Sequence, residues 1–252
     1  MIRKISKGED LNQKNEIHSG IINLGINNIL VPEEHGGLGL DLLFATAISQ
    51  SIGGAVAPLP YCGSYVMAPI AIQIGASKSQ KENIFNEMSS SNIKFGIAFS
   101  EYFGSRDSSS INFSNEKING KTIFAIDCDY ATDVLVSDAS GKIGIVSIED
   151  KNIEIVDLIT VDKTRTYKEI KFSNANVEIL ANTKNSTDGI EKALDAGRII
   201  TAADTLGASQ AMLDKAVSYS KERKQFNRVI GSFQAVKHMC AEMTADLEPC
   251  YS

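Results

Sequence analysis

The sequence of 252 residues contains no tryptophan and has little cysteine or histidine. Its four cysteines, Cys62, Cys128, Cys240 and Cys250, are scattered without paired spacing, which predicts neither a disulfide framework nor a zinc site. The three histidines are isolated from one another and form no metal-binding cluster in the sequence. These shortages argue against a domain held together by metal or disulfides and indicate a reduced, cytoplasmic setting.

Excess positive charge and long apolar runs are also missing. The formal net charge is -6 at pH 7 and no cluster of lysine and arginine stands out, so we expect no nucleic-acid partner. The opening stretch MIRKISKGEDLNQKNE is too polar for a signal peptide, and no apolar run approaches the length of a membrane span. We therefore expect a cytoplasmic protein without a membrane span.

The residues that are present have an ordinary globular composition, 43% hydrophobic and 22% charged, and they fall into three zones. Residues 1–93 have helical periodicity, residues 94–182 carry short β-rich runs with a period of two, and residues 183–252 are helical again. The predicted fold class is α+β. We expect an N-terminal helical domain, a middle antiparallel β-sandwich or barrel domain, and an incomplete C-terminal helical bundle.

The C-terminal zone predicts two helices joined by a short loop. The first begins at Asp188 and runs to about residue 224, and the second begins at Phe233 with Ser232 as its N-cap. Folding gives no reason for four residues around the loop: Arg223, Gln225, Phe226 and Gln234.

Five stretches of the sequence form a recognisable series: LVPEEHGGLGL (30–40), IAFSEYFGSRD (97–107), INGKTIFAIDCDYATDVLV (118–136), LDAGRIITAADTLGASQAML (194–213) and RKQFNRVIGSFQAVKHMCAEM (223–243). In this order and spacing they resemble the acyl-CoA dehydrogenase family, over residues from about 20 to about 248. The resemblance implies an FAD enzyme that desaturates an acyl-CoA thioester between its alpha and beta carbons, with hydride transfer to the flavin.

The resemblance also implies two sets of cofactor contacts. Arg223, Gln225, Phe226 and Gln234 would bind the diphosphate and adenosine part of FAD, usually that of a neighbouring subunit. Phe99, Ser100, Phe124 and Ile126 would face the flavin ring, with Phe124 in the place of a family tryptophan. For Arg223 and Phe226 the alternative is a solvated arginine and a gap-filling aromatic, and for Phe124 it is a plain core residue.

The resemblance supplies no catalytic base. The usual glutamate lies beyond residue 252 in family order, and the position on the long helix that a minority of members use is Gly197 here. Glu101 and Asp195 are not assigned as substitutes. Ser105 and Arg198 are candidate substrate contacts, with a polar turn and a solvated helix arginine as the alternatives.

The expected partners are an acyl-CoA substrate, an acceptor like electron-transfer flavoprotein, and further subunits in a homo- or hetero-oligomer. The chain resembles a family member shortened at both ends, especially the C-terminus, so the second helix is expected to lack part of its cover and to favour oligomerisation or insolubility. Two alternatives stay open. One is a non-catalytic or truncated subunit that completes a partner's FAD site, and the other is a binding module without flavin.

Overall fold

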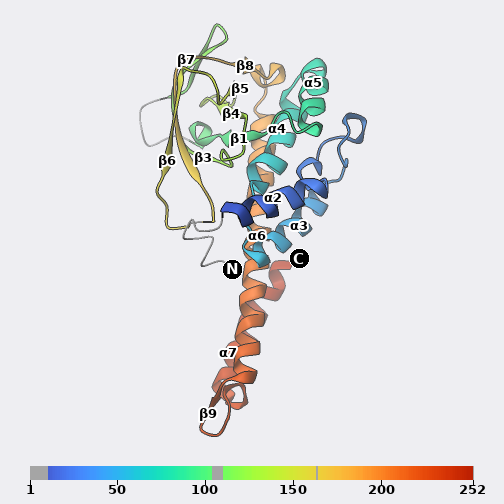
Figure 1. Ribbon diagram of the computed structural model, residues 1–252, viewed down its shortest axis with the longest axis vertical. Helices are drawn as coiled ribbons and strands as arrows, with labels where there is room; N and C mark the ends of the chain where they lie inside the picture. The colour runs from blue at the N-terminus through green and yellow to red at the C-terminus, as the bar shows by residue number, and fades with distance from the viewer. Residues whose placement is uncertain (1–10, 104–109, 163, 252) are drawn as a thin grey trace. The chain divides into compact units, whose positions relative to one another are not determined.

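The computed structural model of the chain describes residues 11–103, 110–162 and 164–251. Their contacts divide the chain into two compact units. Unit 1 comprises the described residues up to Ala45 together with Pro58–Ile199, and unit 2 comprises Thr46–Ala57 together with the described residues from Ile200 onward. Figure 1 follows the chain through helices, a sheet and helices again, which confirms the α+β class.

The N-terminal zone is helical, as its periodicity predicts. Short 3-10 turns follow the first helix, and Ser77 begins the last α-helix of the zone with a capping box in which its side chain and that of Gln80 each bind the other's backbone N–H. The helices are α2 (Leu11–Asn23), α3 (Leu42–Ala55), a π-helix η3 (Tyr61–Met67), α4 (Ala68–Gly75) and α5 (Lys78–Ser89). The π-helix is the unusual member. Such wide turns are rare in proteins, and those that occur often lie at functional sites.

The middle zone forms one hydrogen-bonded sheet of eight strands in the order β6-β7-β3-β1-β4-β5-β8, with β2 on β3. Every pair is antiparallel except β1 and β4, which run parallel from Phe95 opposite Asp133 to Ala98 opposite Val136. The period of two did not predict this parallel pair. The strands are β1 (Phe95–Ala98), β2 (Asn112–Ser114), β3 (Lys117–Ile126), β4 (Asp133–Ser137), β5 (Ile143–Ser147), β6 (Ile153–Leu158), β7 (Tyr167–Asn176) and β8 (Glu178–Ile179).

Strand β1 is buried on both faces because its side chains alternate between two apolar clusters. Phe95 and Ile97 belong to a cluster that also contains Ile72 and Phe85 of the neighbouring helices, which we call the helix-facing core. Ala98 belongs instead to a second cluster built mainly from strand residues. Full burial of a large apolar side chain contributes roughly 1.5–3 kcal/mol, so this strand fixes the sheet against the helices of unit 1.

The C-terminal zone contains the two predicted helices, α6 (Asp188–Glu222) and α7 (Gln234–Leu247). A hairpin of β9 (Lys224–Gln225) and β10 (Arg228–Val229), with the short turn η6 (Ile230–Ser232), joins them. The N-cap prediction was wrong: Phe233 occupies that position, and the Ser232 hydroxyl donates to the backbone oxygen of Val229 instead. In Figure 1 the hairpin lies at the end of α6, and α7 folds back alongside α6.

Within unit 2, α3 and α6 approach so closely that their glycines touch the opposing backbone. A Cβ atom added at Gly53 would lie 1.9 Å from the carbonyl oxygen of Asp204, and one at Gly207 would lie 1.9 Å from that of Gln50. The Ser49 hydroxyl donates to the Ile200 carbonyl at 2.8 Å in the same crossing. Glycine is required here because no side chain fits between the two helices.

Helix α7 buries none of its residues, all of which the structure describes. Val236 and Cys240 are half-buried, whereas Met239 is 61% exposed. The expectation that this helix lacks part of its cover matches these exposures. Within the described residues, no helix combines the length and apolar character that a bilayer crossing requires.

Candidate functional site

The first group of predicted cofactor residues lies where β1 and β3 meet in unit 1. Phe99 follows β1 directly, and its side chain is only 3% exposed in the helix-facing core, so only its backbone is placed to meet a ligand. Ser100 comes next, and its Oγ lies 2.9 Å from Oγ1 of Thr122, a buried residue of β3. When the Thr122 hydroxyl donates to Ser100, the Ser100 proton is left for another acceptor.

Phe124 lies in an irregular stretch of β3, where the register with β7 shifts between Thr122 and Ala125. Its φ of 56° is in the left-handed region, which bulky residues adopt only at an energetic cost. The ring is 58% exposed and meets Tyr167 edge-on, with centroids 6.4 Å apart. Bulges commonly redirect a side chain. Because more than half of the Phe124 side chain is exposed, it is not the core residue of the alternative interpretation. Ile126, at the end of the strand, is partly buried against the helix-facing core.

A buried carboxylate follows immediately after this strand. Asp127 accepts hydrogen bonds from the backbone N–H groups of Gly63, at 2.6 Å, and Ser64, at 3.3 Å, both in the π-helix. Burial raises the pKa of Asp127 to about 6, although the Gly63 N–H and the Arg165 guanidinium oppose the rise. Sequence reasoning missed this residue because its partners lie more than 60 positions away along the chain.

Gly197, the helix position that a minority of family members use for the base, faces the π-helix. A Cβ atom added there would lie 2.8 Å from the Met67 sulfur, and the Cys62 thiol lies 3.7 Å from the Gly197 carbonyl oxygen. Met67 is itself buried. A longer side chain at position 197 therefore fits only if the flexible end of Met67 moves.

Of the two predicted substrate residues, Ser105 lies outside the described residues. Arg198 donates to the Asp195 carboxylate at 2.6 Å, one helical turn away, and both side chains are more than half exposed. This geometry is that of an ordinary solvated helix pair. Glu101 is buried in the short turn η4 (Ser100–Phe103) after β1.

The second group of predicted cofactor residues surrounds the hairpin in unit 2. Phe226 and Asn227 form its two-residue turn with φ values of 52° and 60°, the left-handed combination of a type I′ turn. The Phe226 side chain is 86% exposed, and its ring meets Phe233 edge-on with centroids 6.1 Å apart. Gln225 precedes the turn and pairs with Arg228. Folding does not explain an exposed aromatic ring on so unfavourable a backbone.

Arg223 and Gln234 flank this hairpin. The backbone of Arg223 is held at both ends, because its N–H donates to Tyr219 at 2.9 Å and its carbonyl accepts from Ile230 at 2.8 Å. The Arg223 side chain is exposed. Gln234 begins α7, and its Nε2 atom lies 2.8 Å from Nε2 of His238. An exposed guanidinium on an anchored backbone is a suitable donor for an anionic ligand.

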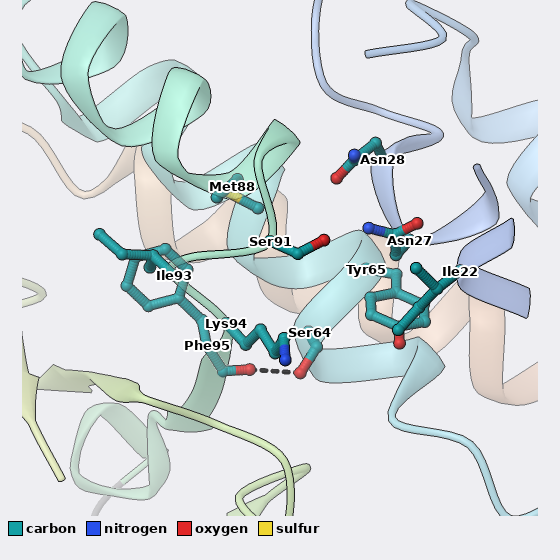
Figure 2. Close-up of a pocket in the computed structure, with 10 residues that line it drawn as sticks. All are labelled: Ile22, Asn27, Asn28, Ser64, Tyr65, Met88, Ser91, Ile93, Lys94 and Phe95. Carbon is teal, nitrogen blue, oxygen red and sulfur yellow. Dashed lines mark hydrogen bonds between the residues drawn. The ribbon is translucent and has the colours of Figure 1, made fainter. Parts of the chain in front are cut away.

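A small hollow in unit 1 is shown in Figure 2. Its volume of about 20 Å³ has room for one water molecule, far less than a cofactor needs. The Asn27 side-chain oxygen near it is buried without a hydrogen-bond partner among the described residues. The lining residues are Ile22, Asn27, Asn28, Ser64, Tyr65, Met88, Ser91, Ile93, Lys94 and Phe95. The hollow therefore belongs to the fold rather than to a cofactor or substrate site.

A metal centre finds no support in the part of the chain that the structure describes. No group of three or more histidine, cysteine, aspartate or glutamate residues in that part is arranged to hold a metal ion.

Comparison with known proteins identifies the family. Residues 2–92 match the N-terminal domain of acyl-CoA dehydrogenases, and residues 187–251 match their C-terminal domain. The probable acyl-CoA dehydrogenase YngJ of Bacillus subtilis is 30% identical over 257 residues, which cover 89% of this chain and 65% of YngJ. The caffeyl-CoA reductase-Etf complex subunit CarC of Acetobacterium woodii is 35% identical over 109 residues, 42% of this chain and 24% of CarC.

The fold agrees with the sequence matches. Butyryl-CoA dehydrogenase from Megasphaera elsdenii superposes with a TM-score of 0.78 at 21% identity, over 91% of this chain and 67% of that protein. The chain thus spans about two thirds of the length of YngJ and of this solved structure. With both terminal domains matched and the fold shared, the chain belongs to the acyl-CoA dehydrogenase family.

Proposed function

We propose that the chain is an FAD-dependent acyl-CoA dehydrogenase-like protein that takes part in the alpha,beta-desaturation of an acyl-CoA thioester. Proteins of its family are flavoproteins that use FAD. Two observations on β3 carry the proposal: Phe124 is exposed on a left-handed backbone, and two positions before it the Thr122 hydroxyl lies 2.9 Å from that of Ser100. An aromatic face and a directed hydroxyl are the groups that a flavin ring needs from a protein.

The residues where β1 and β3 meet fit a flavin ring in distinct ways. The Ser100 hydroxyl, oriented by Thr122, would donate to a ring oxygen or nitrogen, and the backbone at Phe99 would contact the ring. The exposed Phe124 ring would cover one face of the flavin and exclude water from it. When bound, FAD would supply hydride acceptance from the beta carbon, which the protein side chains cannot provide.

The hairpin in unit 2 fits the nucleotide end of an FAD molecule, which in this family is usually that of a neighbouring subunit. Arg223 would bind the diphosphate with its planar set of donors, and Gln225 and Gln234 would add neutral hydrogen bonds. Phe226 would offer its exposed ring to the adenosine part. The position of Gln234 in the first turn of α7 adds the partial positive charge of a helix N-terminus.

The substrate and the electron acceptor are proposed from the family and its named relatives. An acyl-CoA is the substrate class implied by the family, with Arg198 and Ser105 as candidate contacts. CarC is named as a subunit of a complex with Etf, and we propose a similar electron-transfer flavoprotein as acceptor here. We also propose homo- or hetero-oligomeric assembly and the three-domain division at residues 1–93, 94–182 and 183–252.

A second candidate function is a non-catalytic subunit that completes a partner's FAD site through the Arg223 hairpin. It is favoured by the Met67 sulfur, which fills the space beside Gly197 where a base would project. In this form the chain would bind nucleotide but would not abstract the alpha proton by itself.

The proposal is tested by titrating the purified chain with FAD and following flavin fluorescence and heat release. Arg223→Ala should weaken FAD binding about 10- to 150-fold, because a charge-assisted hydrogen bond contributes about 1.5–3 kcal/mol. Lys215→Ala, which removes an exposed positive charge elsewhere on α6, is the matched control and should leave the affinity unchanged. Equal affinities of the wild-type chain and the Arg223→Ala variant would show that the diphosphate is placed wrongly.

A further inference from the structure

The hairpin contains an arginine that sequence reasoning did not select. The Arg228 guanidinium carbon lies 4.0 Å from the centroid of the Phe233 ring, in cation–π contact with its face. Phe233 also contacts the ring of Phe226. The two ring centroids are 6.1 Å apart, and the rings are nearly perpendicular, with an interplanar angle of 80°. Phe233 is thus held between a cation on its face and a second ring, and we call these three residues the hairpin cluster.

The hairpin cluster is organised around a costly turn. Type I′ turns favour asparagine and glycine because both central residues need positive φ, yet Phe226 occupies the first central position. Its ring is almost fully exposed and adds little to a core. Phe233, by contrast, is half-buried and is the N-cap of α7, so it is a fixed support. The orientation of an exposed ring on a fixed support can therefore serve binding rather than folding.

We propose that Arg228 is a positioning residue for the nucleotide end of the cofactor. By stacking on Phe233, Arg228 holds the ring that Phe226 leans against, and it thereby sets the orientation of Phe226 before the adenosine arrives. Binding then avoids part of the entropy cost of ordering the hairpin, as pre-organised sites do. This inference rests on the proposed function, since it requires that the hairpin receives FAD.

The expected effect is modest and has a distinctive salt dependence. Arg228→Gln should weaken FAD binding about two- to fivefold, the value of an exposed cation–π contact. Because Arg228 acts through a ring and not on the diphosphate, the loss should be the same for FAD and for adenosine. It should also be the same at low and high salt. The loss in Arg223→Ala should instead shrink as salt rises and should be absent for adenosine.

A double-mutant cycle with Phe233→Leu isolates the stacked pair. The leucine keeps an apolar N-cap but removes the ring, so Arg228→Gln should have no further effect on FAD affinity in that background. Lys224→Gln removes a charge from the same hairpin without stacking and is the matched control. Melting temperatures of all variants are recorded, so that a general loss of the hairpin fold is recognised separately.

The outcomes separate this inference from the proposed function. Unchanged affinity in Arg228→Gln, additive losses in the double variant, or a loss that vanishes at high salt would each overturn the positioning role. The last of these would show a direct charge contact instead. Failure of the wild-type chain and every variant to bind FAD would overturn the proposed function itself.

Discussion

The two units of the molecule obtain their stability in different ways, and helix α6, which contributes to both, shows the difference. In unit 1, Gly197 faces a flexible methionine side chain, and the surrounding core joins strands and helices that are distant in sequence. In unit 2, Gly207 faces a rigid backbone carbonyl, and α7 buries no residue. Unit 1 therefore spreads its packing over many side chains, whereas unit 2 contains a crossing in which the backbones of α3 and α6 lie in direct contact.

The largest expected effect concerns catalysis at the unit 1 glycine. We predict that the unmodified chain does not turn over, and that Gly197→Glu combined with Met67→Ala gains about 100- to 10,000-fold in rate, the usual value of a general base. The second substitution makes room without requiring Met67 to move, because the Met67 sulfur lies 2.8 Å from the position of the new Cβ atom. The measurement is anaerobic bleaching of bound flavin by a panel of acyl-CoAs.

Two results would revise this prediction. Rapid bleaching by the unmodified chain would mean that a base was missed, and Glu101 would be the first to replace. Absence of bleaching in the double variant despite bound FAD would mean that a carboxylate at this position is not sufficient.

The next effect tests the contrast in burial directly. Phe95→Ala should lower the free energy of unfolding by about 3–5 kcal/mol, because Phe95 is fully buried in the helix-facing core. Met239→Ala on α7 should change it by less than about 0.5 kcal/mol, because most of that side chain is exposed. Chemical denaturation measures both. A large loss at Met239 would indicate that α7 is covered in solution, for instance by another subunit.

The contribution of the α3–α6 crossing to the stability of unit 2 is tested at Gly207. Gly207→Ala should destabilise by about 3 kcal/mol, the upper part of the usual range for overpacking, because the new methyl group meets backbone rather than a movable side chain. Hydrogen exchange should locate the loss in unit 2. Gly20→Ala in α2 is the control: nothing lies within 4 Å, so the better helix former should stabilise by up to about 1 kcal/mol. Similar effects of the two substitutions would contradict the close packing of α6 against α3 at Gly207.

The last effect depends on pH and belongs to unit 1. The folded pKa of Asp127 is raised from 3.8 to about 6, so the folded state holds its proton more tightly than the unfolded state does. The contribution of Asp127 to stability is therefore complete below pH 4 and is lost as pH rises to about 6, by up to about 3 kcal/mol. Asp127→Asn should remove this fall while its side-chain oxygen still accepts from the π-helix.

Asp150 provides a control of opposite sign for that experiment. Backbone hydrogen bonds from Asn176 and Asn152 lower the pKa of Asp150, so its contribution is present at neutral pH and is lost as pH falls. Denaturation curves of Asp127→Asn and Asp150→Asn between pH 3 and pH 8, in the range where the fold persists, measure the two contributions. An unchanged pH profile in Asp127→Asn would mean that another group causes the fall.

The sequence predicted those features that local patterns record. Periodicity and capping residues indicated the order of zones and the start of α6 at Asp188, and the odd loop composition singled out Phe226, whose ring is exposed. The parallel pairing of β1 with β4 and the contact of Asp127 with the π-helix depend on segments brought together only by folding. The role of Gly207 was not predicted for the same reason. A glycine inside a helical pattern indicates only low helix propensity until the segment packed against it is known.

The π-helix Tyr61–Met67 makes chain length, more than residue identity, the sensitive property of this segment. Its wide turns hold more residues than α-helical turns would, so removing one residue would let the segment tighten into an α-helix. Everything after the deletion would then rotate by about 100° relative to what precedes it. Met67 would leave Gly197 and the N–H groups that face Asp127 would be redirected. Natural variation should therefore exchange residues in this stretch far more readily than it inserts or deletes them.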